Sequence, residues 1–149
     1  MIMRTPTVFE VAEYFRYLSV PGTDKEITHL KLQKLVYYAE AMYMKINKEH
    51  LFNEDFQAWV HGPVCPELYY CYNNFGSSTI PPVNNKPIID EKYTRVLDIA
   101  WLLFGDKDGK YLENKTHQES PWINARKGFG GNERSNTIIN KQEMLAYYR

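Results

Sequence analysis

Residues 29–47, HLKLQKLVYYAEAMYMKIN, are the most informative stretch of the sequence, because apolar side chains cover almost the whole circumference of one predicted helix. Thr28 is a suitable N-cap, and Ile27 with Leu32 has the spacing of a hydrophobic staple. The two apolar stripes on nearly opposite sides comprise Leu32, Leu35, Val36, Ala39, Tyr43 and Ile46, and Leu30, Tyr37, Ala41 and Met44. A helix that is apolar nearly all round is buried, so we expect it at the centre of the fold.

The polar remainder of this helix is narrow. Lys31, Lys34 and Lys45 share one edge, and Gln33 and Glu40 share the other. A row of lysines on a helix most often forms a solvated edge, since lysine is almost never fully buried unless it is paired.

The other elements are predicted by helical spacing, caps and breakers. Thr7 and Glu10 form a capping box for a helix from Val8 to Leu18. The further predicted elements are a strand at 56–60, a turn at Gly62 and Pro63, a helix from Pro66 to Gly76, a helix at 91–104 capped by Asp90, short helices near 110–113 and at 121–126 with Ser120 as N-cap, a one-rung strand at 137–139 and a helix at 141–148 capped by Asn140. We therefore expect a mainly α fold, a single compact domain over residues 1–149 with six to seven helices around the central helix at about 29–47 and a minor short β-sheet.

Length and composition exclude several classes of protein. The 149 residues suit one domain, and 44% hydrophobic with 24% charged residues is typical of globular proteins. Eighteen Lys and Arg balance 18 Asp and Glu, which does not favour phosphate-dominated DNA binding. The longest apolar run, 99–104, is far too short to span a membrane, and residues 1–10 have no signal-peptide pattern. We expect a cytoplasmic protein.

No residue pattern supports catalysis or metal binding. His61, Cys65 and Cys71 lack the tight ligand pairs of structural zinc sites, and the glycines of 128–131 lack the Lys-Ser/Thr of a phosphate loop. We interpret the two cysteines as free thiols and small buried groups in a helix. We expect no enzyme activity, catalytic residue, metal or cofactor. A nucleophilic site pairing either cysteine with His61 or His117 is an alternative.

Two groups of His, Trp and Pro residues stand at irregular junctions of the predicted elements. The groups are Trp59, His61, Gly62 and Pro63, and Thr116, His117, Pro121 and Trp122. In the structural interpretation both tryptophans cap the core and both histidines satisfy loop carbonyls. In the functional interpretation they form a rigid aromatic and polar patch that anchors a protein interface.

Three segments resemble a known family in their sequence and order. They are ITHLKLQKLVYYAEAMYM (27–44), LFNEDFQAWVHGPVCPELYYCYNNFG (51–76) and THQESPW (116–122). Together they resemble the Panacea domain of SocA-like, phage-associated (GepA-like) antitoxins, over roughly residues 8–126. The segment IAWLLFG (99–105) departs mildly from that pattern, and the residues after Gly128 follow no pattern of the family.

The resemblance implies a non-enzymatic antitoxin that neutralises a cognate toxin, encoded nearby, by direct protein–protein binding. We expect the partner-binding residues to be Trp59, His61, His117 and Trp122, with Lys31, Lys34 and Tyr38 on one edge of the central helix as further candidates. One alternative is a proteolytic adaptor that delivers the toxin to a AAA+ protease. Less favoured alternatives are a DNA-binding autoregulator and a small Cys/His enzyme. We expect neither nucleic acid nor a membrane as a partner.

Overall fold

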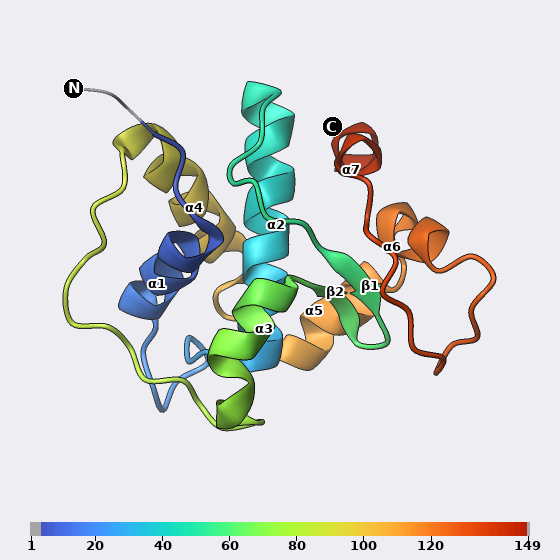
Figure 1. Cartoon of the computed structure of the whole chain (residues 1–149). Helices are drawn as coiled ribbons and strands as arrows, with labels where there is room; N and C mark the ends of the chain where they lie inside the picture. The colour runs from blue at the N-terminus through green and yellow to red at the C-terminus, as the bar shows by residue number, and fades with distance from the viewer. Residues whose placement is uncertain (1–3, 149) are drawn as a thin grey trace.

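This computed structural model describes residues 4–148 of the chain. They contain seven α-helices and a two-stranded sheet, joined by loops. The elements are α1 (Val8–Leu18), α2 (His29–Asn47), β1 (Gln57–Trp59), β2 (Gly62–Val64), α3 (Pro66–Tyr72), the 3-10 helix η1 (Asn73–Phe75), α4 (Glu91–Phe104), α5 (Gly109–Thr116), α6 (Ser120–Ala125) and α7 (Lys141–Tyr148). Figure 1 shows α2 upright in the middle, with α1 and α4 on one side and the hairpin, α5, α6 and α7 on the other. The expected mainly α fold is confirmed.

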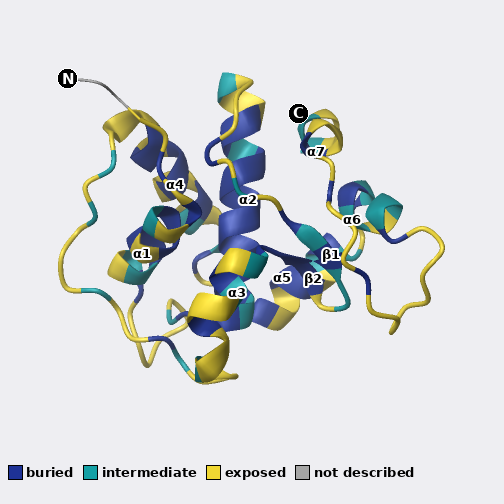
Figure 2. Cartoon of the chain, in the orientation of Figure 1, coloured by how far each residue is buried: buried dark blue, intermediate teal, exposed yellow. Residues whose placement is uncertain are grey.

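Helix α2 is the centre of the fold, as its sequence predicts. Every residue from Lys31 to Ala41 is buried, and Figure 2 shows the helix dark along most of its length. Thr28 caps it by accepting a hydrogen bond from the Lys31 amide, 3.4 Å from Oγ1. The prediction that the whole apolar stripe is buried is wrong for Ile46, which is 55% exposed. The last turn of α2 extends beyond the helices that flank it (Figure 1).

The β-hairpin differs from the prediction in the position of its turn. β1 and β2 pair antiparallel with Trp59 opposite Gly62, so Val60 and His61 form the turn. The prediction that Gly62 and Pro63 make the turn is therefore wrong, since both lie in β2. Gly62 has φ +104°, a backbone conformation that favours glycine.

A third segment extends this sheet by one rung. Gln57 and Ile138 form an isolated antiparallel bridge, and the Ala58 amide donates to the Thr137 carbonyl at 2.8 Å. The one-rung strand predicted at 137–139 is confirmed, so the chain after α6 returns to the hairpin.

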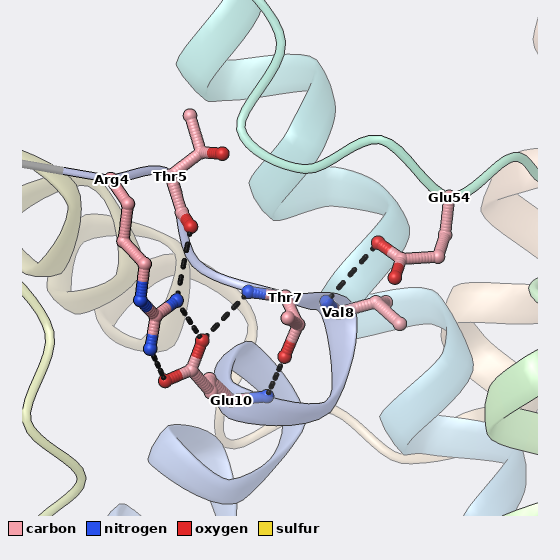
Figure 3. Close-up of polar contacts among 6 residues, drawn as sticks. All are labelled: Arg4, Thr5, Thr7, Val8, Glu10 and Glu54. Atoms are coloured by element: carbon pink, nitrogen blue, oxygen red, sulfur yellow. Dashed lines mark hydrogen bonds and ion pairs between the residues drawn. The ribbon is translucent and has the colours of Figure 1, made fainter.

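The N-terminus of α1 is held by the capping box that the sequence predicts (Figure 3). The Glu10 amide donates to Thr7 Oγ1 at 3.1 Å, and the Thr7 amide donates to Glu10 Oε1 at 2.9 Å. Arg4 donates two hydrogen bonds of 2.8 Å to the same carboxylate. The Val8 amide donates to Glu54 Oε1 at 3.3 Å, which ties α1 to the segment before β1.

Helices α5 and α6 differ from the prediction at their ends. Helix α5 is longer than the predicted 110–113, because Asp108 Oδ1 caps it by accepting from the Tyr111 amide at 2.8 Å. Helix α6 begins at Ser120, so Ser120 is not its N-cap; Glu119 holds that position without a side-chain capping bond. Among residues 4–148, no helix is long and apolar enough to cross a membrane.

The two cysteines are free thiols, as predicted. Cys65 is buried at the N-cap of α3, but Cys71 is exposed, so the expectation that both are buried is wrong for Cys71. Cys71 lies on α3, which packs on α2 through Leu68 and Tyr72 and leaves the Cys71 side to solvent.

Candidate partner-binding site

The two His/Trp groups singled out in the sequence meet in the structure. The Trp122 indole Nε1 donates to the Trp59 carbonyl at 2.8 Å. The His117 ring stacks on the Trp122 ring with 4.1 Å between centroids and 16° between planes. His61 Nδ1 lies 3.1 Å from Glu113 Oε2 on α5. The hairpin and the α5–α6 junction therefore form one surface, the His–Trp surface, made of Trp59, His61, His117 and Trp122.

Exposure differs among the four residues of the His–Trp surface. The His61 side chain is 71% exposed, whereas Trp59, His117 and Trp122 are half-buried. Trp122 packs against the hydrophobic core, so the structural interpretation holds for its inner face. Burial lowers the pKa of His117, and its Nε2 is a buried side-chain atom without a hydrogen-bond partner among residues 4–148. The His117 ring is thus held by stacking on Trp122, and His61 is the side chain open to a partner.

Glu113 positions His61 and was missed by reasoning from the sequence. Burial would raise the pKa of Glu113, but hydrogen bonds from His61 and Lys110 outweigh it and hold the pKa below its ordinary value. A buried carboxylate thus anchors an exposed imidazole. No local signal in the sequence indicates this contact, because Glu113 and His61 are 52 residues apart.

Lys31 and Lys34 are buried, so the expectation that these lysines form a solvated edge is wrong, and Tyr38 is buried as well. Lys31 Nζ donates to the carbonyls of Asp24, Glu26 and Gly105 at 3.0, 2.8 and 2.6 Å. Lys34 is fully buried and donates to the Pro63 carbonyl at 3.1 Å, and burial lowers its pKa to about 7. Tyr38 is buried, and its hydroxyl donates to Glu119 Oε1 at 2.7 Å. These side chains hold loops and helices against α2.

Gln33, which directly precedes Lys34 on α2, has the same structural role. Its Oε1 accepts from the Cys65 amide at 2.9 Å, and its Nε2 donates to the Cys65 carbonyl at 3.3 Å. The side-chain amide therefore pairs with the backbone at the end of β2, as a neighbouring strand would.

Gly62 joins the three sequence segments in space. A Cβ atom at Gly62 would lie 2.7 Å from Lys34 Cε and 2.9 Å from Thr116 Oγ1. Real Cβ atoms do not approach other atoms so closely, so glycine is required by contact as well as by its backbone angle. Each of the segments 27–44, 51–76 and 116–122 thus contributes one residue to a buried junction beneath the His–Trp surface: Lys34, Gly62 and Thr116.

A pocket of about 660 Å³ opens beside the His–Trp surface. Its walls come from the start of α2, the hairpin, α3, the start of α5 and residues 134–136; its apolar lining consists of Leu30, Trp59, Val60, Val64 and Tyr69. His61 and Glu113 belong to both the pocket and the network just described.

The surroundings of Cys65 do not favour thiol chemistry. The Cys65 thiol lies 3.5 Å from Glu67 Oε1, and burial raises its pKa to about 12, which disfavours the thiolate. Within residues 4–148, no cluster of three or more His, Cys, Asp or Glu side chains is arranged to hold a metal ion.

Comparison with known families assigns the chain to a class. The family model described as antitoxin SocA-like, Panacea domain, matches residues 32–123, which is more than half of the chain. The protein therefore belongs to the antitoxin SocA-like, Panacea-domain family. The matched range includes Lys34, Gly62 and all four residues of the His–Trp surface.

A curated relative agrees with the family assignment. The chain is 39% identical to Antitoxin SocA of Caulobacter vibrioides (strain NA1000 / CB15N) over 57 residues. The match covers 38% of this chain and 30% of that relative, so most of the relative's length lies outside it. No solved structure matches the chain.

Proposed function

We propose that this protein is an antitoxin that neutralises a cognate toxin by binding it directly, without chemistry, through the His–Trp surface. Membership of the family supports the antitoxin role. The observation that carries the site is that two groups far apart in the sequence form one half-exposed aromatic surface, fixed by the hydrogen bond from Trp122 Nε1 to the Trp59 carbonyl.

The His–Trp surface is suited to protein binding because it is rigid before a partner arrives. The Trp122 ring is held by its indole hydrogen bond and by stacking on His117, and His61 is held by Glu113. Side chains that are already ordered lose little conformational entropy on docking, and aromatic side chains at the centre of an interface commonly dominate its binding energy.

The partner we propose is a toxin encoded by a neighbouring gene and met in the cytoplasm. In the simplest mechanism the antitoxin covers a surface that the toxin needs. In the adaptor alternative the same contact hands the toxin to a AAA+ protease. Burial of Lys31 and Lys34 removes two of the three lysines that an autoregulator would have used to contact DNA phosphates.

Co-expression of the chain with its neighbouring gene tests the proposal. We expect the neighbouring gene to arrest growth alone, the unaltered chain to restore growth, and His61→Ala to lose rescue while its circular dichroism spectrum is unchanged. His50→Ala, at another exposed histidine, is the matched control and should rescue fully. A harmless neighbouring gene, or rescue by a folded variant in which His61 and Trp59 are both alanine, would contradict the proposal.

Toxin lifetime separates occlusion from delivery to a protease. Under occlusion the toxin accumulates in complex with the antitoxin, so its half-life in cells lengthens or is unchanged. Under delivery its half-life shortens when the antitoxin is present, and deletion of the protease abolishes rescue.

A further inference from the structure

The pocket beside the His–Trp surface has an apolar wall built from separate parts of the chain. The Trp59 and Tyr69 rings lie 5.0 Å apart between centroids in an edge-to-face arrangement, and Leu30, Val60 and Val64 continue the wall. Pockets of several hundred Å³ bury most of a drug-sized ligand, so about 660 Å³ accommodates a bulky side chain with its neighbouring backbone.

One exposed cation at the rim of the pocket favours an anionic group beside it. Of the two carboxylates in the lining, Glu113 is paired with His61 and Lys110, whereas Asp108 keeps its charge while its Oδ1 caps α5. Lys34 also borders the pocket but has no exposed surface, so it is not available to a ligand. Arg134 lines the pocket and is exposed, and among residues 4–148 no side-chain hydrogen bond or ion pair engages it.

We infer that this pocket receives a linear segment of the toxin that carries one bulky apolar side chain next to an acidic residue. The apolar side chain lies against Trp59 and Tyr69, and the carboxylate pairs with Arg134. The inference rests on the proposed function and deepens it, because His61 lines both the pocket and the His–Trp surface. A guanidinium pairs with a carboxylate through two parallel hydrogen bonds, which would fix the direction of the bound segment.

Paired variants at the rim test the inference by calorimetry with toxin separated from the co-expressed complex. Ser77→Trp should obstruct the pocket, whereas Ser78→Trp adds the same bulk at a neighbouring exposed position outside the lining. Arg134→Glu should repel the acidic residue, whereas Lys127→Glu makes the same change of charge outside the pocket. We expect the two pocket variants to weaken binding about tenfold or more, the loss typical of an interface anchor, and the two controls to leave it within about twofold.

A selection in the toxin gene identifies the acidic residue. Toxin variants should be selected that remain toxic alone and are again neutralised by the Arg134→Glu antitoxin. We expect an Asp or Glu changed to Lys or Arg next to a bulky apolar residue. If Ser77→Trp and Arg134→Glu bind as tightly as the unaltered chain while His61→Ala does not, the inference is overturned and the proposed function stands.

Two short peptides test the chemistry of the pocket without the toxin. At millimolar concentration, acetyl-Phe-Asp should shift the Trp59 indole N–H resonance of the full chain, and acetyl-Phe-Lys should shift it less. Trp59 lines the pocket, so its indole N–H resonance reports on this wall. An equal shift, or none with either peptide, overturns the inference; failure of the unaltered chain to bind the toxin instead overturns the proposed function.

Discussion

The two sides of helix α2 are held by different forces. Towards α1 and α4 the contacts are mainly those of fully buried apolar side chains, such as Phe15 and Leu97. Towards the hairpin, α5 and α6 the contacts depend on polar side chains of α2 itself, with Gln33 bound to the Cys65 backbone and Lys34 to the Pro63 carbonyl. Apolar packing tolerates small shifts, whereas a hydrogen bond to a particular carbonyl fixes position. The His–Trp surface stands on the polar side, where positions are fixed most closely.

The largest effect is expected on the apolar side. Leu97 has no exposed surface, so Leu97→Ala should lower the free energy of unfolding by about 2–5 kcal/mol, the loss for a leucine truncated in a packed core. Urea denaturation measures this. Leu102→Ala on the same helix is the control, because Leu102 is 81% exposed, and should cost under about 0.5 kcal/mol. Equal losses for both variants would show that α4 does not pack as described.

The second effect lies on the polar side, at Gly62. Gly62→Ala should cost about 1–3 kcal/mol, because alanine is strained at φ +104° and its Cβ would meet Lys34 and Thr116. Gly131→Ala is the matched control, since no atom lies within 4 Å of a Cβ there. Urea denaturation of both variants should therefore separate them. A Gly62→Ala protein as stable as the control would contradict the close contact of Gly62 with Lys34 and Thr116 beneath the His–Trp surface.

The third effect depends on pH. The folded pKa of Lys34 is about 7 because burial disfavours its charge, although Glu113 partly opposes this, and the ordinary value is 10.5. Between these values the unfolded chain binds the proton that the folded chain has released, so this residue makes stability rise with pH from about 7 to 10.5.

Lys34→Met isolates that contribution. Above pH 10.5, where the amine is neutral in both states, the variant should lose about 1 kcal/mol with the Pro63 hydrogen bond. At pH 7 the unaltered chain must release the Lys34 proton to fold, so there the variant should be at least as stable. As pH rises towards 10, the stability difference should grow in favour of the unaltered chain. Lys45→Met, on an exposed position of the same helix, should show no such trend. A difference that does not change over this range would mean that Lys34 keeps its proton in the fold.

The smallest effect concerns an exposed polar contact on the apolar side. The hydrogen bond from Arg4 lowers the pKa of Glu10 to about 2. The stability from this carboxylate is present above the ordinary pKa of 4.5 and is lost as pH falls towards 2. Because the pair is largely open to solvent, Glu10→Gln should cost only about 0.5 kcal/mol at pH 7. Thermal unfolding at pH 7 and pH 3, with Glu13→Gln as control, measures it; a loss equal to that of Gly62→Ala would contradict the comparison.

Local signals in the sequence were sufficient for much of the fold. Helices α1, α2 and α4 have the predicted bounds, because each combines an apolar repeat with a side-chain cap, such as Thr7 for α1 or Asp90 for α4. Helix α7 also has the predicted bounds, because Asn140 caps it. Helix α5 was predicted too short, because its cap at Asp108 precedes a glycine and few apolar residues follow. The turn was misplaced because Gly-Pro usually marks a turn, whereas here contacts with α2 draw both residues into β2.

The apolar repeat of residues 29–47 is sufficient to predict a buried central helix, because a helix that is apolar nearly all round needs packing partners on every side. Local sequence patterns also indicate Trp59, His61, His117 and Trp122 as candidates. The three-dimensional fold is needed to show that these four form one surface, and that Lys31 and Lys34 lie inside the protein. The carbonyls that satisfy the two lysines come from Asp24, Glu26, Gly105 and Pro63, on loops whose positions depend on the complete fold. A buried lysine is stable only where such acceptors converge, and no local pattern records that convergence.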